Sequence, residues 1–77
     1  MKEHNPMEPT LSQVMDICQQ WRKKHNVGPT LDELHFVLTQ KLHSAIFDYE
    51  IEGIIDIGVK GGVFEVRGGH VEVIGKL

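Results

Sequence analysis

The chain is poor in the features that staple or anchor a small protein. It has one cysteine, Cys18, among 77 residues, which excludes an internal disulfide and a zinc cluster built on sulfur. No apolar run approaches the roughly 18 residues of a membrane span, and the N-terminus has no apolar run of the signal-peptide kind. We therefore expect a cytoplasmic protein with no membrane partner.

Positive charge is also scarce. Eight Lys and Arg stand against 11 Asp and Glu, which gives a net charge of −3. Residues 27–53 carry one Lys against five acids, and the only basic run is Arg22-Lys23-Lys24, followed by His25. Because nonspecific affinity for nucleic acid comes mainly from Lys and Arg at the phosphates, this balance argues against a general polyanion binder.

The length allows one small domain. A chain of this size buries only about 60% of the surface that it exposes when unfolded, so a partner is expected to supply part of the stability. Residues 1–10 contain Pro6 and Pro9 and no periodic pattern, which predicts a flexible arm. Residues 11–77 are then the single domain.

Periodicity predicts helices first and strands later. Apolar residues recur at helical spacing from Leu11 to about Asn26, and Thr30 opens a second helix that ends near Thr39. A third helical pattern follows directly and ends at Gly53. Beyond it, residues 54–59, 63–67 and 70–74 have strand character between glycine turns. The prediction is an α+β domain in which three helices precede a small antiparallel hairpin or meander.

Three segments carry a family resemblance: Leu11-Ser12-Gln13-Val14-Met15-Asp16-Ile17, Gly28-Pro29-Thr30-Leu31-Asp32-Glu33-Leu34 and Glu50-Ile51-Glu52-Gly53-Ile54-Ile55. Together they resemble the DNA-binding domain of the LexA repressor and its winged helix-turn-helix relatives. The resemblance spans roughly residues 11–58. It implies a winged-helix fold whose third helix, here about residues 40–52, enters the major groove of DNA.

The resemblance also implies a set of contact residues. Leu42, Ile46 and Tyr49 are expected to face the core. The outward face of the helix is then Gln40, Lys41, His43, Ser44 and Phe47, a mixture that can pair with adenine and guanine or touch a thymine methyl. Lys60, at the turn expected to form the wing tip, is the sixth candidate. Arg67 and His70 are interpreted as solubilising residues of the hairpin.

Metal binding and catalysis lack a supporting motif. The five histidines show no i, i+4 pair and no C-x-x-C type spacing. There is no nucleophile elbow, and a domain this small has little room for a pocket that excludes water. We expect no metal, no cofactor and no enzymatic activity.

Two functions remain open. The first is a small transcriptional regulator that binds duplex DNA, as a homodimer with helix 1 and the last strand as its contact surfaces. The second is a winged-helix protein-interaction module, an adaptor or a modulator encoded by a phage or mobile element, that uses its acidic middle segment or the edge of its wing. The net charge of −4 over residues 27–53 and the exposed Phe47 on the expected DNA-reading helix motivate the second, and Asp48, Glu50 and Glu52 on that helix would repel phosphates.

Overall fold

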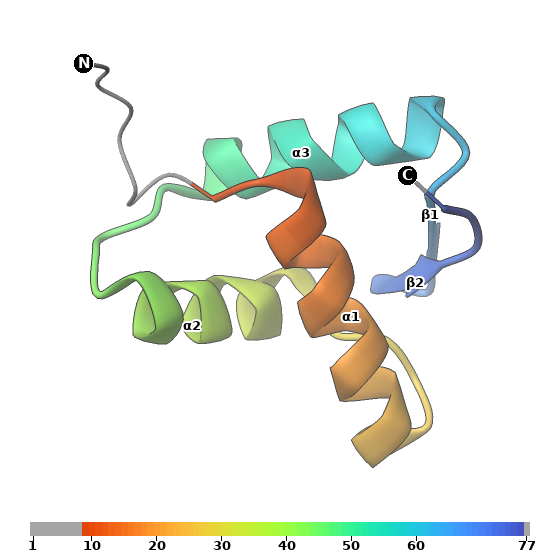
Figure 1. The fold of residues 1–77 in the computed structure, drawn as a ribbon, viewed down its shortest axis with the longest axis horizontal. Coiled ribbons are helices and arrows are strands. Elements are labelled where there is room, and N and C mark those ends of the chain that lie inside the picture. Colours follow the sequence, from red (N-terminus) through yellow and green to blue (C-terminus); the bar gives the residue numbers. More distant parts are fainter. Residues whose placement is uncertain (1–8, 77) are drawn as a thin grey trace.

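The computed structural model describes residues 9–76, and Figure 1 shows three helices followed by a hairpin. The elements are α1 (Leu11–His25), α2 (Leu31–Leu42), α3 (Asp48–Lys60), β1 (Phe64–Arg67) and β2 (His70–Val73). The predicted α+β class, with three helices before an antiparallel hairpin, is confirmed. Only the last two residues of the predicted N-terminal arm lie within the described residues.

The first two helices begin at capping boxes. The hydroxyl of Thr10 accepts the Gln13 N–H at 3.1 Å, and the Gln13 side chain accepts the Thr10 N–H at 3.0 Å. Thr30 and Glu33 repeat the arrangement at α2, with distances of 3.2 and 2.8 Å. Each box satisfies two backbone donors that the first turn leaves without a helical partner. Both helix starts are therefore fixed by local sequence, and the start of α2 at Thr30 is as predicted.

The third helix lies eight residues further along the chain than predicted. α2 continues past Thr39 to Leu42 and ends at His43, which has a left-handed φ of 52°. Residues 44–47 form a loop, and α3 starts after Phe47, whose backbone N–H is capped by the Glu50 carboxylate at 3.1 Å. The prediction of one helix over residues 40–52 is wrong, because a turn without Gly or Pro separates its two halves.

Helical periodicity continues through the segment predicted as a strand. Ile51, Ile55 and Gly58 are buried at i, i+4 and i+7, which places one face of α3 on the core. Gly53 lies in the middle of the helix and is not its C-cap. The helix stops at Gly61-Gly62, where Gly62 has a φ of 77°. The predicted strand over residues 54–59 is wrong, since burial of this face outweighs the β propensity of its Ile and Val residues.

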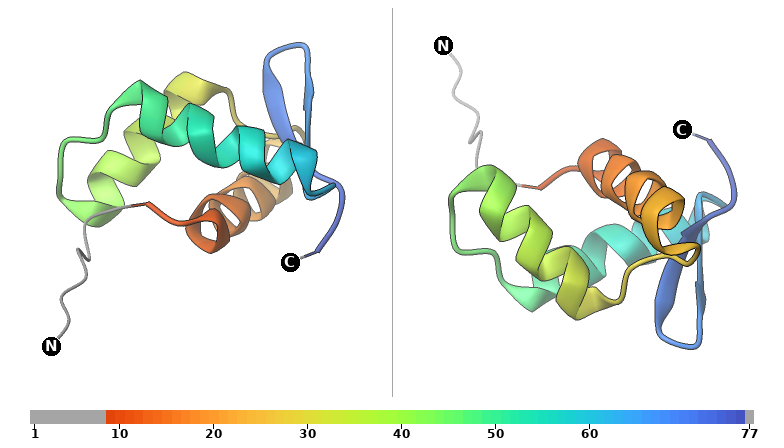
Figure 2. Two further views of the ribbon diagram at one scale, coloured as in Figure 1. Left: turned by 90° about the horizontal axis from the view of Figure 1, so that it is seen from above. Right: turned by 90° about the horizontal axis from the view of Figure 1, so that it is seen from below.

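The hairpin matches its prediction to within one residue at each outer end. β1 and β2 are antiparallel, with Phe64 opposite Val73 and Arg67 opposite His70. Gly68 and Gly69 link them with φ values of 55° and 84°, the pair of positive angles that a type I′ turn requires. Thr30 bridges to His70 on the other side of β2, so the hairpin lies beside the start of α2 and the end of α3 (Figure 2).

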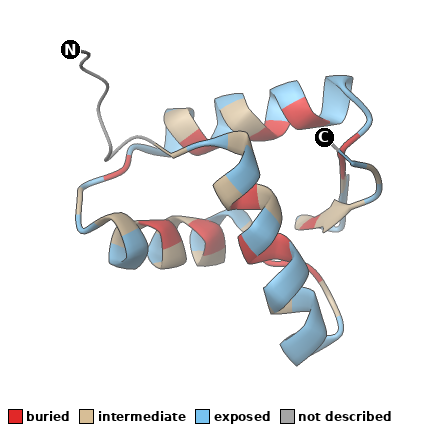
Figure 3. Cartoon of the chain, viewed as in Figure 1, coloured by how far each residue is buried: buried red, intermediate tan, exposed pale blue. Residues whose placement is uncertain are grey.

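The core lies between the three helices and the hairpin. Its fully buried side chains include Val14, Leu34, Leu38, Ile51, Phe64 and Val71. Ile46 is buried and Leu42 is half-buried, as predicted. Tyr49 was expected in the core and is 69% exposed, because the true start of α3 turns it outward. Figure 3 shows the outer side of α3 exposed along its length. Within residues 9–76, no helix is long and apolar enough to cross a membrane.

Candidate interaction surface on α3

The exposed side of α3 carries a row of carboxylates. Asp48, Glu52 and Asp56 recur at i, i+4 and i+8 and are all exposed, so they line up about 6 Å apart along the helix. Lys60 continues the row and pairs with Asp56 at 3.2 Å. The other two carboxylates have no Lys or Arg partner among the described residues; the closest cationic candidate is His35, whose Nε2 lies 4.0 Å from Asp48. We call these three residues the acidic row.

An apolar row runs beside the acidic row. Tyr49, Gly53 and Ile57 also recur every four residues, and Tyr49 and Ile57 are 69% and 63% exposed. Phe47 extends this row at the start of the helix, since its ring stacks on Tyr49 with centroids 5.5 Å apart and planes 8° from parallel. Side chains of this size with so much exposed surface are typical of contact surfaces when they lie next to one another.

A groove of about 310 Å³ lies on the other side of the acidic row, between α3 and the hairpin. Its apolar lining comes from α2, α3 and both strands: Leu31, Ile55, Val59, Val66 and Val71. Its charged lining is Glu52 and Asp56. A smaller hollow near the start of α2 and α3 is also lined by acids, among them Asp32 and Asp48. No Lys, Arg or His lines either depression.

The cations of the hairpin are already paired. Arg67 contacts Glu65 at 3.0 Å, and the hydrogen bond that its guanidinium donates to this carboxylate raises the pKa of Arg67. Arg22 of α1 reaches Glu72 of β2 at 2.8 Å. His70 donates through Nδ1 to the carbonyl of Gly28, 2.8 Å away. Arg67 and His70 therefore both have partners within the domain.

The six residues predicted to contact DNA do not lie on one helix. Gln40 and Lys41 are exposed in the last turn of α2, His43 caps that helix, and Ser44 is half-buried in the following loop. Phe47 and Lys60 are at the two ends of α3, so Lys60 is a helix residue and not part of a wing tip. The predicted face is corrected accordingly, because the break at His43 divides it between two helices and a loop.

A second depression lies at the other end of the molecule, between α1 and α2. It measures about 220 Å³ and is lined by Trp21, Lys24, His25 and Lys41, among others. The ring of Trp21 lies 4.4 Å from that of His25. No carboxylate lines this depression, so it has the opposite charge to the groove at α3.

The last strand, which was predicted to be part of a dimer surface, contributes some of its apolar residues to the core. Val71 is buried and Val73 packs against the core cluster. Ile74 remains 56% exposed, and Leu77 lies outside the described residues. The last strand therefore offers less apolar surface to a second subunit than its sequence indicates.

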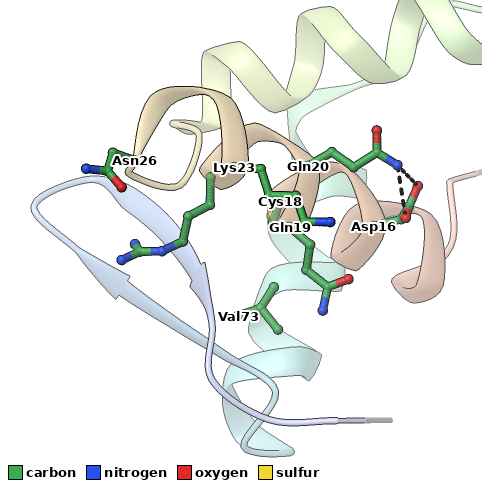
Figure 4. A pocket seen from close by; sticks show the side chains of 8 residues that line it. Asp16, Cys18, Gln19, Gln20, Lys23, Asn26 and Val73 are labelled. Carbon is green, nitrogen blue, oxygen red and sulfur yellow. Dashed lines mark hydrogen bonds between the residues drawn. The ribbon is translucent and has the colours of Figure 1, made fainter.

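Cys18 lies at a further depression, of about 660 Å³, between α1 and β2 (Figure 4). Figure 4 shows that polar side chains surround it, including Asp16, which accepts hydrogen bonds from the Gln20 amide. Burial raises the pKa of the Cys18 thiol to about 12, so the thiol stays protonated and is a poor nucleophile at neutral pH. Over residues 9–76, no three His, Cys, Asp or Glu side chains form a group that could hold a metal ion.

The acidic row, the apolar row and the groove were largely missed from the sequence, because residues 54–59 were assigned to a strand. The helical spacing of Ile51 and Ile55 was the signal that could have found them. Comparison of the chain with protein-family models, curated proteins and solved structures finds no match. What the domain binds is therefore inferred from the chemistry of its own surface.

Proposed function

We propose that this chain is a winged-helix protein-interaction module that binds a basic segment of another protein through the exposed side of α3 and the adjoining groove. One observation carries the proposal: the third helix, which reads DNA in the family that the sequence resembles, presents Asp48, Glu52 and Asp56 outward. The expected cytoplasmic location is part of the same proposal.

Electrostatics disfavours DNA on this face. A carboxylate about 7 Å from a phosphate is repelled by about 0.6 kcal/mol even in water, and by more at a partly desolvated interface. The acidic row would place several such repulsions along one groove of a duplex. Lys60 is the only Lys or Arg of α3, and it already pairs with Asp56. The same carboxylates attract a Lys- or Arg-rich protein segment and speed its association.

The groove supplies apolar contacts in addition to those of the apolar row. Leu31, Val59 and Val66 line it and are 39%, 44% and 50% exposed, so a partner side chain that covers them removes apolar surface from water. Glu52 and Asp56 lie at the same groove and can pair with cations next to that side chain. An apolar anchor flanked by Lys or Arg is thus the partner chemistry that fits both components.

Duplex DNA remains a second candidate, at the opposite end of the domain. Lys24 of α1 and Lys41 of α2 meet at the depression between these helices, where no carboxylate is present. Gln40 is exposed beside Lys41. These residues favour contact with a phosphate backbone, because Lys at phosphates supplies sequence-independent affinity. The proposal for α3 does not depend on this surface.

Selection from a random peptide display library tests the proposal. Peptides retained by the wild-type domain should combine Lys or Arg with large apolar residues. For a retained peptide, Glu52→Gln should weaken binding by about three- to tenfold, as expected for the loss of one partly desolvated ion pair. The matched control Asp16→Asn removes an exposed charge from α1 and should leave binding unchanged. Equal effects of the two substitutions, or retained peptides without basic residues, would exclude the proposed face.

A further inference from the structure

Gly53 is the one residue of the α3 surface whose size has no explanation inside the described domain. It lies mid-helix and exposed, and a Cβ added to it would meet nothing within 4 Å. Gly58 of the same helix differs, because a Cβ there would collide with the ring of Phe64. Glycine in an exposed helix interior is less stable than alanine. The small size of Gly53 thus leaves space for an atom from outside the domain.

The neighbours of Gly53 turn this space into a notch. Tyr49 and Ile57 lie one turn before and one turn after it on the same face, and both side chains project from an exposed surface. Two large residues about 12 Å apart with a glycine between them accept a ridge of another helix. A small residue at the crossing point also allows the two helix axes to approach to the short end of the usual 8–10 Å range.

Charge decides which helix fits the notch. In an antiparallel pair of α3 helices crossing at Gly53, Glu50 of each copy would lie opposite Asp56 of the other, and the acidic rows would add to the repulsion. A second copy of this chain is therefore disfavoured. A helix with an apolar stripe and Lys or Arg beside it has the complementary pattern.

We infer that the notch at Gly53, between Tyr49 and Ile57, is the binding site for a helix from another protein. This helix crosses α3 at Gly53, packs its apolar stripe against the notch and places its basic residues on the acidic row. The inference rests on the proposed function and adds the secondary structure of the partner segment and its crossing point. In this arrangement Gly53 fits the shape of the partner helix, and Glu52 and its neighbours attract its positive charge.

A designed 18-residue peptide tests this binding site. It has Leu and Ala at helical i, i+3, i+4, i+7 spacing and Lys and Arg on the flanks. One control peptide replaces Lys and Arg with Glu, and another has the same composition with the stripe scrambled. Binding to the wild-type domain is measured by fluorescence anisotropy. The basic amphipathic peptide should bind at least tenfold more tightly than either control.

Substitutions at the notch separate this inference from the proposed function. A Cβ at position 53 meets nothing within 4 Å, so circular dichroism of Gly53→Gln should show an intact fold while peptide affinity falls at least tenfold. Ser12→Gln, an enlargement at an exposed position of α1, should bind as wild type. If Glu52→Gln weakens binding and Gly53→Gln does not, the binding site at Gly53 is wrong and the proposed function stands.

Two other outcomes overturn the inference. If the basic peptide does not bind the wild-type protein at all, both the binding site at Gly53 and the helical partner are wrong. Sedimentation equilibrium that shows a homodimer dissociated by Gly53→Gln would assign the notch to a second copy of the chain, against the charge argument.

Discussion

The carboxylate of Glu72 on β2 accepts the backbone N–H of Gly28 at 2.9 Å and the Arg22 guanidinium at 2.8 Å. These two bonds join the hairpin to the loop between α1 and α2 and to the end of α1. The side chain of Glu72 is only 12% exposed. The hairpin, which forms one wall of the groove at α3, is therefore held in place through this carboxylate.

The bonds to Glu72 predict a loss of stability in acid. The Gly28 N–H, together with Arg22, lowers the pKa of Glu72 below its usual value of 4.5. A carboxylate with a lowered folded pKa contributes stability above its unfolded pKa and loses it as the pH falls through the folded value. Glu72→Gln should reduce the free energy of unfolding by about 1 kcal/mol at pH 7. Urea titrations should show that this difference shrinks below about pH 4; a difference that persists unchanged at pH 2.5 would contradict the assignment.

The two glycines within α3 should respond in opposite directions to alanine. Gly53→Ala meets open space and should raise the free energy of unfolding by about 0.5–1 kcal/mol. Gly58→Ala collides with Phe64 and should lower it by about 1–3 kcal/mol, the usual cost of overpacking a core. Thermal denaturation of the two variants checks this. Destabilisation by Gly53→Ala would show that Gly53 has a role inside the domain.

Cys18 should be protected from thiol reagents in the native protein. The side chain is 2% exposed, and its pKa is raised to about 12, so the thiolate that reacts is almost absent at pH 8. Labelling with iodoacetamide should be slower by at least about a hundredfold in buffer than in denaturant, because reaction requires opening of α1. Equal rates in the two conditions would mean that α1 does not cover this residue.

Association with a basic peptide should depend on salt. Exposed carboxylates such as Glu52 and Asp48 attract a cationic ligand before contact, and ions screen this attraction over about 10 Å at 0.1 M salt. The association rate should fall by roughly tenfold between 0.05 and 0.5 M NaCl, while the dissociation rate changes little. Stopped-flow measurements test this, and a rate independent of salt would exclude the acidic row from the encounter.

The parts of this fold that depend on interactions between neighbouring residues could be predicted from the sequence. The capping threonines Thr10 and Thr30 and the turn at Gly68-Gly69 act through neighbouring residues, so their sequence signals suffice. The third helix depends on packing. Ile55 and Gly58 become helical because that places them on the core and against Phe64, contacts between residues that the sequence order does not reveal.

The candidate surface was less predictable than the fold. The acids of the middle segment pointed to a protein partner, but Asp56 and Ile57 were placed in a strand and the residues before His43 in the wrong helix. The bend at His43 has a positive φ without glycine, so no strong turn signal marks it. A surface composed of rows on a helix can be recognised only once the limits of that helix are known.

The most direct test of peptide binding at α3 is an NMR titration of the uniformly ¹⁵N-labelled domain with a selected basic peptide and, separately, with a pool of random duplex DNA at low salt. The peptide should shift the amide signals of Tyr49, Gly53 and Ile57 together with Val66, and DNA should leave these signals unchanged. Amide shifts on the exposed side of α3 caused by DNA, with none caused by the peptide, would contradict peptide binding at α3.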